Sequence, residues 1–284
     1  MRPPSPVTRG GIQQVADRWT TDISISVVSH SQIDLVSDLL TGLKAYCSAL
    51  RFELILTLNL AETLPFTLES FPFPIRLIEN PSPLGFGANQ NQAFTQASGR
   101  YFCVINPDIQ LECNPFAPLL ACIEHSGAGV IAPAVVGEDG ALEDSARRFP
   151  TPWMILRKFF GAVLAHDYVI RDSLVYPDWV AGMFMMFPRE LFERLEGFDE
   201  RYFLYYEDVD ICARLRRLGY AAVVCPQARV VHRAQRHSHR NFRYLRWHLQ
   251  SMLRFFLSDA WRRIRHGPLK KPGVGRAGDN EPGQ

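Results

Sequence analysis

Acidic side chains occur at two places where the surrounding residues favour ligand chemistry. The first is Asn106-Pro107-Asp108, which follows the apolar run 101–105. An acid at the carboxyl end of a central parallel strand lies where α/β sheets bind their ligands. A divalent ion such as Mg²⁺ needs few protein ligands when phosphate oxygens complete its shell, so Asp108 is a candidate metal ligand. The alternative is an ordinary turn, because the same three residue types also suit one.

The second acidic cluster is Glu207-Asp208-Val209-Asp210, at the start of an expected helix. Three acids there interact favourably with the helix dipole, so a purely structural role is one interpretation. The preceding residues 202–206 are aromatic or apolar, however. Apolar surroundings raise the pKa of a carboxylate and make it a usable general base. The residues alone leave both interpretations open.

Two further segments carry weaker signals. His232 follows the short apolar run 229–231, and it is either a structural histidine or a metal ligand. The segment 80–91 contains Gly85 and Gly87, which permit close approach of the backbone to a ligand. It does not match G-x-G-x-x-G and has no P-loop lysine, so neither a dinucleotide site nor an NTPase is indicated.

The elements that must position these residues alternate between strand-like and helix-like patterns in the first half of the chain. The expected strands are 23–28, 52–58, 75–78 and 101–105, and the expected helices are 34–50 and 88–97. This rhythm predicts an α/β fold with an open, mostly parallel sheet flanked by helices. The second half is less regular. Its expected strands are 128–131, 180–187, 223–224 and 229–231, and its expected helices are 153–164, 188–195, 207–218 and 241–265.

The length of 284 residues favours one large α/β domain over two small ones. We place that domain at residues 21–240, followed by a basic helix at 241–266. The Pro-containing leader 1–20 and the Gly/Pro-rich tail 267–284 are expected to be disordered.

Several features indicate a cytoplasmic protein. No run of roughly 18 apolar residues predicts a transmembrane helix. The leader lacks the apolar stretch of a secretory signal. The six cysteines show neither a C-x-x-C pair nor zinc-site spacing, as is typical of reduced thiols in the cytosol.

The charge distribution is uneven. Residues 232–271 carry eleven Lys and Arg against one acid, whereas residues 1–231 carry 19 basic and 26 acidic side chains. Within the basic segment, aromatic and aliphatic residues recur at helical spacing, which predicts an amphipathic helix on the inner leaflet of a membrane. The alternative is a terminal helix packed on the body with its charges solvated. Clustered Lys and Arg also bind nucleic acid, but no recognition motif accompanies them, so we expect no nucleic-acid partner.

Together and in this order, the segments resemble the family 2 glycosyltransferases of GT-A fold, and among them the bacterial rhamnosyltransferases of polysaccharide and O-antigen assembly. The likeness covers roughly residues 22–240. The matching motifs are N-x-G-F-G-x-x-N at Asn80 to Asn89 with a small insertion, LNPD at Ile105 to Asp108, W-x-x-G at Trp179 to Gly182, GFDE-x-FF-x-Y-x-EDVD-x-C-x-R at Gly197 to Arg214, and a later histidine at His232.

The resemblance implies an inverting enzyme with a nucleotide-sugar donor, a Mg²⁺ or Mn²⁺ ion, and a saccharide acceptor carried on a polyprenyl lipid. Rhamnose is the sugar that it suggests. It also assigns roles: Asp208 as catalytic base with Glu207 beside it, Asp108 and His232 at the metal, Asn89, Asn106 and Asp108 at the donor, and Trp179 and Gly182 at the acceptor.

Two motifs of the family are altered in this sequence. The first strand of the family usually ends in VTYN, but here it reads Val28-Ser29-His30. The second usually ends in VDNxS, with an Asp near the nucleotide base, and the corresponding stretch 56–62 has no Asp. The nucleotide is therefore unassigned, and a non-catalytic sugar-nucleotide-binding relative is the alternative. The retained Asp108, Glu207 and Asp208 favour an enzyme.

Overall fold

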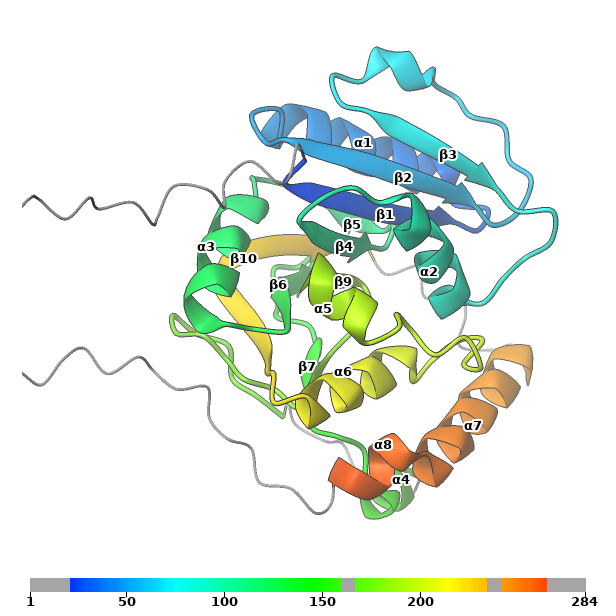
Figure 1. Ribbon diagram of the computed structural model, residues 1–284, viewed down its shortest axis with the longest axis vertical. Coiled ribbons are helices and arrows are strands. Elements are labelled where there is room, and N and C mark those ends of the chain that lie inside the picture. Colours follow the sequence, from blue (N-terminus) through cyan, green and yellow to red (C-terminus); the bar gives the residue numbers. More distant parts are fainter. Residues whose placement is uncertain (1–20, 160–166, 234–241, 265–284) are drawn as a thin grey trace, which may run out of the picture.

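An eight-stranded sheet runs through the molecule in the order β3-β2-β1-β4-β9-β6-β10-β5 (Figure 1). The computed structural model describes residues 21–159, 167–233 and 242–264. The expected leader 1–20 and tail 267–284 lie outside the described residues. The strands are β1 (Ile23–Ser29), β2 (Phe52–Leu58), β3 (Ile75–Glu79), β4 (Tyr101–Ile105), β5 (Ile109–Gln110), β6 (Val130–Gly137), β9 (Phe184–Pro188) and β10 (Ala222–His232).

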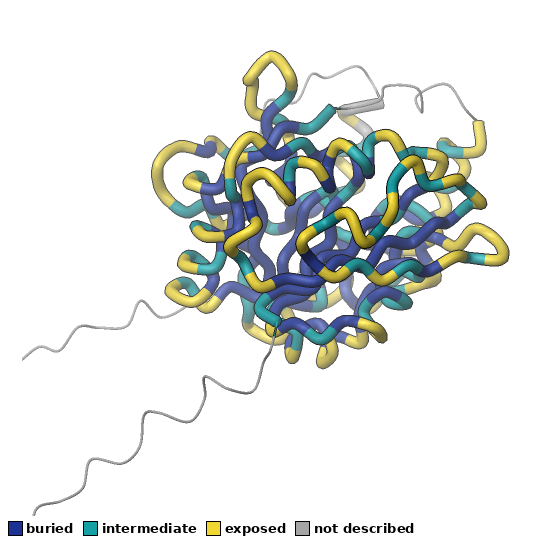
Figure 2. Tube along the Cα trace, turned by 90° about the horizontal axis from the view of Figure 1, so that it is seen from above, coloured by how far each residue is buried: buried dark blue, intermediate teal, exposed yellow. Residues whose placement is uncertain are grey.

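Side chains alternate along the strands between two cores, one on each face of the sheet. Tyr101, Cys103 and Ile105 of β4 enter one core, and Phe102 and Val104 enter the other. Strands covered on both faces are apolar throughout, which is why β4 could be recognised in the sequence. Figure 2 shows the buried chain as a continuous interior surrounded by exposed loops.

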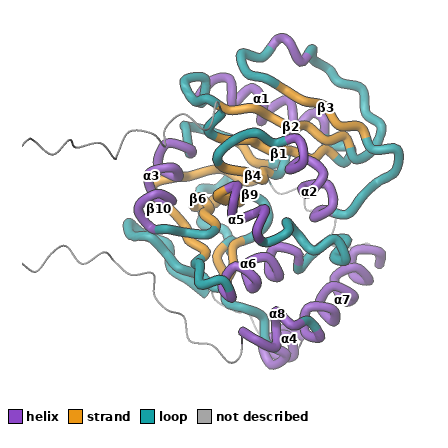
Figure 3. Tube along the Cα trace, viewed as in Figure 1, coloured by secondary structure: helices purple, strands orange, loops and turns teal. Residues whose placement is uncertain are grey.

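Helices cover both faces of the sheet. The helices α1 (Ile33–Tyr46) and α3 (Phe116–Ser126) pack into the core that contains Ile25 and Leu54. The opposite core is closed by α2 (Phe86–Gln96), α5 (Arg189–Arg194) and α6 (Glu207–Arg217). The predicted α/β fold with a mostly parallel sheet flanked by helices is thus confirmed (Figure 3).

A smaller group of elements lies beyond α6. It contains a two-stranded sheet of β7 (Ala146–Arg147) and β8 (Trp179–Val180), and the helices α4 (Pro152–Phe159), α7 (Phe242–Leu257) and α8 (Asp259–Ile264). Figure 1 shows α4, α7 and α8 gathered at the end of the molecule opposite β3. Phe255 and Trp261 bury their rings in the core below α6. Among the described helices, none has the length and apolar character needed to cross a bilayer.

The prediction of one continuous strand at 180–187 is wrong. The chain pairs through β8 with β7, leaves that sheet at residues 181–183, and then enters the main sheet as β9, antiparallel to β4. The interruption has a physical reason, because the Gly182 amide donates to a side chain, Asp208 Oδ2, rather than to a strand. An apolar run does not reveal this break, nor the direction of a strand.

Other boundaries also differ from prediction. The expected helix 241–265 is divided at Ser258, whose Oγ accepts from the Trp261 amide at 3.1 Å and so caps a new helix. The expected strands 223–224 and 229–231 belong to one strand, β10, which continues past a register shift between Cys225 and Arg229. The helix α3 was not predicted, although Asn114 and Gly127 mark its two ends.

Candidate active site

Two cavities open beside each other at the carboxyl ends of the parallel strands. The Asp108 cavity, of ≈ 520 Å³, is lined by Val28, His30, Gln32, Asn59, Leu60, Pro83, Leu84, Phe86, Asn89, Asn106, Pro107, Asp108, Phe203, Leu204, Arg243, Tyr244 and Trp247. The Asp208 cavity, of ≈ 580 Å³, is lined by Asp144, Arg147, Arg148, Pro150, Met154, Ile155, Asp167, Trp179, Ala181, Met183, Tyr205 to Val209 and His248. The segment 203–206 and the helix α7 contribute to both cavities, so they form the shared wall.

The predicted pair Asp108 and His232 comes together in the structure. Their side chains approach to 3.2 Å between Oδ2 and Nε2, and His232 Nδ1 lies 2.7 Å from Glu143 Oε2. Burial alone would lower the pKa of His232, but the two carboxylates overcome it and raise this pKa to about 9. Glu143 carries no signal in the sequence, because its partner is 89 residues away.

The residues Asp108 and His232 fit a divalent ion. Asp108 Oδ1 is buried without a hydrogen-bond partner in the described chain, and Oδ2 lies beside Nε2, so these atoms can face one ion. Glu143 would then hold the other nitrogen of the ring, as outer carboxylates commonly do for histidine ligands. Across residues 21–159, 167–233 and 242–264, no three His, Cys, Asp or Glu side chains converge as a metal site. Phosphate oxygens and water would have to complete the shell, as is usual for Mg²⁺.

A network of asparagine side chains shapes the loop beside Asp108. Asn89 is 1% exposed, and its Nδ2 donates to the carbonyls of Leu84 and Gly85. Its Oδ1 accepts from Asn80 at 2.7 Å, and Asn80 also donates to Asn59 at 2.9 Å. Asn89 therefore braces the loop from behind. Direct contact between Asn89 and a donor stays a prediction, as it does for Asn106, which lies in the cavity wall.

The second acidic cluster lies in the Asp208 cavity. It follows a sharp turn in which Tyr205 and Tyr206 both adopt left-handed backbone, with φ of 69° and 70°. Such conformations cost on the order of 1–3 kcal/mol each for a residue other than glycine, and they concentrate at functional sites. The turn starts α6 at Glu207, so that both Glu207 and Asp208 lie in the cavity wall.

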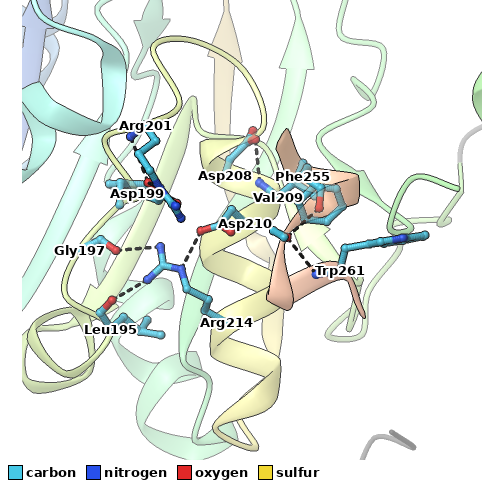
Figure 4. A network of polar contacts seen from close by, with 12 residues as sticks. Leu195, Gly197, Asp199, Arg201, Asp208, Val209, Asp210, Arg214, Phe255 and Trp261 are labelled. Carbon is cyan, nitrogen blue, oxygen red and sulfur yellow. Dashed lines mark hydrogen bonds and ion pairs between the residues drawn. The ribbon is translucent and has the colours of Figure 1, made fainter. Parts of the chain in front are cut away.

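Asp208 is held by backbone amides from two elements. Its Oδ2 accepts from Gly182 N at 3.0 Å. Its Oδ1 accepts from Val209 N at 2.8 Å (Figure 4). Trp179 lies in the same wall, and its Nε1 donates to the carbonyl of Arg148 at 2.9 Å. The fold thus brings Gly182 into contact with Asp208 and Trp179 into the same cavity wall, although they precede Asp208 by 26 and 29 positions.

The two carboxyl groups of this cavity have different surroundings. Glu207 is 5% exposed, and its Oε2 has no hydrogen-bond partner among the described residues. Burial, and then repulsion from Asp208, hold the pKa of Glu207 well above its usual value. Burial also raises the pKa of Asp208, but the amides of Gly182 and Val209 and the charge of Arg147 oppose the rise. Asp208 is therefore the better-stabilised anion of the two.

The third acid of the cluster has a structural role. Asp210 is buried and pairs with Arg214 at 2.7 Å, one helical turn further along α6. Arg214 also donates to the carbonyls of Leu195 and Gly197, which anchors α6 to the segment that precedes it (Figure 4). The interpretation of the acidic cluster as structural thus holds for Asp210.

The helix α7 adds residues that the sequence did not place at a site. Arg243, Tyr244 and Trp247 line the Asp108 cavity, and His248 lines the Asp208 cavity. The ring of Trp247 packs against Phe203 with a centroid distance of 4.7 Å, which fixes α7 to the shared wall.

Comparison with protein families gives one match, to the model described as "Glycosyl transferase family 2", over residues 24–193. Curated relatives at 30% identity include two different rhamnosyltransferases. Rhamnosyltransferase WbbL of Escherichia coli (strain K12) aligns over 186 residues, which are 60% of this chain and 69% of that protein. N-acetylglucosaminyl-diphospho-decaprenol L-rhamnosyltransferase of Mycobacterium tuberculosis (strain ATCC 25618 / H37Rv) aligns over 182 residues, 56% of this chain and 58% of that protein.

Solved structures share the fold at low identity. The mannosyltransferase PcManGT from Pyrobaculum calidifontis, in complex with GDP-Man and Mn²⁺, superposes with a TM-score of 0.60 at 17% identity, covering 89% of this chain and 69% of that one. GalNAc-T7 with UDP, GalNAc and Mn²⁺ gives 0.60 at 16% identity, covering 78% of this chain and 44% of that one. The chain thus spans less than half of the second structure, and both comparisons concern the fold alone.

Proposed function

Because the chain belongs to glycosyl transferase family 2, we propose that it moves a sugar from a nucleoside diphosphate in the Asp108 cavity to an acceptor hydroxyl in the Asp208 cavity. One observation carries this proposal: two cavities share a wall, and each contains one of the two acids that the chemistry requires. A donor diphosphate beside Asp108 would place its sugar at that shared wall, toward Asp208.

Asp108 and His232 would hold the divalent ion, Mg²⁺ or Mn²⁺. When bound, such an ion neutralises negative charge on the diphosphate as it leaves. The Mn²⁺ in PcManGT and GalNAc-T7 supports this choice of cofactor. Glu143 fixes the ring orientation of His232 through its hydrogen bond to Nδ1.

Asp208 would act as the general base in a single displacement. Its carboxylate takes the proton of the acceptor hydroxyl while that oxygen bonds to the anomeric carbon. The bond from the anomeric carbon to the diphosphate oxygen breaks in the same step, with its electron pair leaving on the diphosphate, so the anomeric configuration inverts. The amides of Gly182 and Val209 aim the carboxylate, and Trp179 offers an apolar surface to the acceptor.

The sugar that we propose is rhamnose, and the acceptor is a saccharide on a polyprenyl lipid. The names of both relatives include rhamnosyltransferase, and one name specifies a decaprenol-linked acceptor. The O-antigen biosynthesis protein RfbC of Myxococcus xanthus, 26% identical over 228 residues, supports a role in polysaccharide assembly.

A lipid-linked acceptor implies work at a membrane surface, and the outer face of α7 supports this. Five apolar side chains recur there at spacings of three and four residues and are 49% to 88% exposed: Phe242, Leu245, Leu249, Leu253 and Leu257. The opposite side of α7 packs on the body through Ser251 and Phe255. Exposed arginines on α7 and α8 would favour an anionic inner leaflet. We therefore propose a peripheral position at the cytoplasmic face of the inner membrane.

Cosedimentation with vesicles tests the membrane part of the proposal. The variant Leu245→Gln/Leu249→Gln/Leu253→Gln should lose binding to anionic vesicles, because it removes the apolar stripe without removing charge. Leu142→Gln/Leu218→Gln, which changes exposed leucines on other elements, should bind like the wild type. Equal binding by all three proteins would contradict the membrane role.

A panel of nucleotide sugars tests the enzymatic part. Calorimetry with and without Mn²⁺ should give metal-dependent binding of a donor, and Asp108→Ala should abolish it. Asp208→Asn should retain donor binding and lose transfer to an acceptor saccharide. Loss of donor binding in Asp208→Asn, or full binding in Asp108→Ala, would reverse the assignment of the two cavities.

A further inference from the structure

Asp208 follows a turn whose backbone conformation is unfavourable for its own residues. Tyr205 and Tyr206 both have left-handed backbone, with φ of 69° and 70°, and α6 begins directly after them at Glu207. Residues other than glycine keep such a conformation only where the surrounding structure imposes it. Tyr206 is the N-cap of α6 and makes no side-chain capping hydrogen bond, so the helix has no local cap of the usual kind. Contacts from other elements must therefore fix the place where α6 begins.

One face of α7 supplies contacts of this kind to all four residues of the segment 203–206. Ser251 Oγ donates to the carbonyl of Leu204 at 2.9 Å. Three ring side chains of α7 contact the other members of the segment, at these centroid distances: Trp247 with Phe203 at 4.7 Å, His248 with Tyr205 at 5.4 Å and with Tyr206 at 5.5 Å, and Phe255 with Tyr206 at 5.6 Å. Positions 247, 248, 251 and 255 share one face of a helix because of their spacing. The helix α7 therefore holds the whole turn from one side.

Ser251 is the member of this face whose chemistry serves the turn rather than the helix. Its side chain is 5% exposed, and a buried hydroxyl needs a hydrogen-bond partner, which here is the carbonyl of Leu204. Serine has a lower helix propensity than alanine, so α7 itself gains nothing from a serine in its interior. A hydrogen bond also restricts position more than ring packing does, because it weakens steeply when its angle departs from the optimum. Ser251 thus fixes the Leu204 carbonyl relative to α7.

The position of the turn decides one of the two hydrogen bonds that Asp208 accepts. The amide of Val209 belongs to α6, so it moves with Asp208 when the start of the helix moves. The amide of Gly182 lies on a different part of the fold, in the break between β8 and β9, and reaches Asp208 Oδ2 at 3.0 Å. A shift of the turn would therefore lengthen the bond from Gly182 and leave the bond from Val209 intact.

We propose that Ser251 is a positioning residue for Asp208. Through its hydrogen bond to Leu204 it holds the turn 203–206 on α7, and the turn in this place keeps the Asp208 carboxylate on the Gly182 amide. The inference rests on the proposed role of Asp208 as general base. Residues 242–257 lie outside residues 24–193, which the family model matches, so the contacts of this chain carry the inference.

Carboxyl ¹³C NMR of the free protein tests the position of Asp208 without any ligand. Ser251→Ala should raise the pKa of Asp208, because the amide of Gly182 is a donor that favours the carboxylate. The signal that disappears in Asp208→Asn identifies Asp208 in the spectrum. Hydrogen exchange at the Gly182 amide should become faster in Ser251→Ala. The substitution removes no charge, and it leaves in place the other titratable and charged groups of the cavity: Asp144, Arg147, Arg148, Asp167, Glu207 and His248.

Ser258→Ala is the matched control, because it removes a hydroxyl directly after α7 whose hydrogen bonds lie within residues 255–261. Both serine-to-alanine variants should lower Tm. Only Ser251→Ala should also lower kcat, by about tenfold for the donor that the calorimetric panel identifies, which is roughly what one hydrogen bond contributes. Ser251→Cys keeps a weak donor, so its kcat and its Asp208 pKa should lie between those of the wild type and Ser251→Ala. Wild-type values in Ser251→Ala, or in Ser251→Cys where Ser251→Ala does not fold, would overturn the inference.

The outcomes separate this inference from the proposed function. If Asp208→Asn loses transfer but Ser251→Ala leaves the pKa of Asp208 and the exchange of the Gly182 amide unchanged, the positioning role is wrong and the base stands. If Asp208→Asn keeps the wild-type turnover, Asp208 is not the base, and the inference fails together with the proposed function.

Discussion

The chemistry of the Asp208 cavity depends on two adjacent carboxyl groups that the fold treats differently. Glu207 is buried, and its Oε2 has no hydrogen-bond partner in the described chain, whereas Asp208 accepts two backbone amides. When the surroundings of two neighbouring acids separate their pKa values, that difference commonly indicates which group acts as acid and which as base. The residue pattern alone did not distinguish the two acids, and only the resemblance to the family assigned the base role to Asp208. The contact that separates them, the amide of Gly182 on Asp208, exists only in the folded chain.

The first prediction concerns the base. Asp208→Asn should lower kcat by about 10²–10⁴-fold, the usual contribution of a positioned general base. Asp210→Asn is the matched control, because it removes an ion pair to Arg214 outside the cavity. It should lower Tm while the folded enzyme keeps its kcat. Turnover of Asp208→Asn near the wild-type rate would remove Asp208 from the mechanism.

The second prediction concerns the pH dependence of activity. Burial raises the pKa of Asp208 above its usual 3.8, so activity should fall on acidification at a pH higher than that of an ordinary Asp. Arg147 opposes this rise, because its positive charge favours the carboxylate. In Arg147→Gln the acid limb of the kcat/KM profile should therefore move to still higher pH. Arg100→Gln, which breaks an exposed pair with Glu124 on another element, should leave the limb in place.

The third prediction concerns stability. The folded protein raises the pKa of Glu207, so between the unfolded value near 4.5 and the folded value it binds more protons than the unfolded chain does. Stability must then decrease as pH rises through that interval. Glu207→Gln should raise Tm most at alkaline pH and should flatten this part of the profile. A pH profile of Tm that Glu207→Gln leaves unchanged would mean that Glu207 is solvated.

At the scale of elements, the site depends on how closely the segment 197–206 approaches α2. A Cβ built on Gly85 would lie 2.6 Å from the carbonyl oxygen of Phe203, and that carbonyl accepts from Phe86 N at 2.9 Å. Gly85 therefore stood out in the sequence, but its role in the structure differs from the expected one. The sequence suggested that Gly85 approaches a ligand, whereas in the structure it admits another part of the chain.

The fourth prediction follows from this contact. Gly85→Ala should push the segment around Phe203 away from α2, because the obstructing atom is backbone, and should cost about 1–3 kcal/mol of stability. Donor affinity should fall as well, since Phe203 lines the Asp108 cavity. Ser82→Ala, at an exposed position of the same loop, should change neither quantity. Thermal unfolding and calorimetry measure both.

At the scale of the whole molecule, the predicted fold class is confirmed, and the predicted family is too. The strands β2 and β4 are buried along their whole length and rich in apolar residues, and their ends were predicted to within a residue. The antiparallel direction of β9 was not predicted, because a hydrophobic pattern does not show in which direction a strand runs. Contacts such as that between Glu143 and His232 join distant segments, so local patterns do not encode them.

The described part of the chain segment between β6 and β9 contributes residues to only one of the two cavities. Residues 138–178 supply one wall of the Asp208 cavity, from Asp144 to Asp167, and none of the residues that line the Asp108 cavity. The chain leaves the main sheet after β6, passes through the small sheet of β7 and β8, and returns to the main sheet at β9. We therefore expect this proposed acceptor wall to tolerate exchange between relatives. A chimaera that takes residues 144–178 from a relative keeps Glu143 and its hydrogen bond to His232, so it should acquire a new acceptor and keep its nucleotide sugar. Such exchange would let these enzymes diversify one partner at a time.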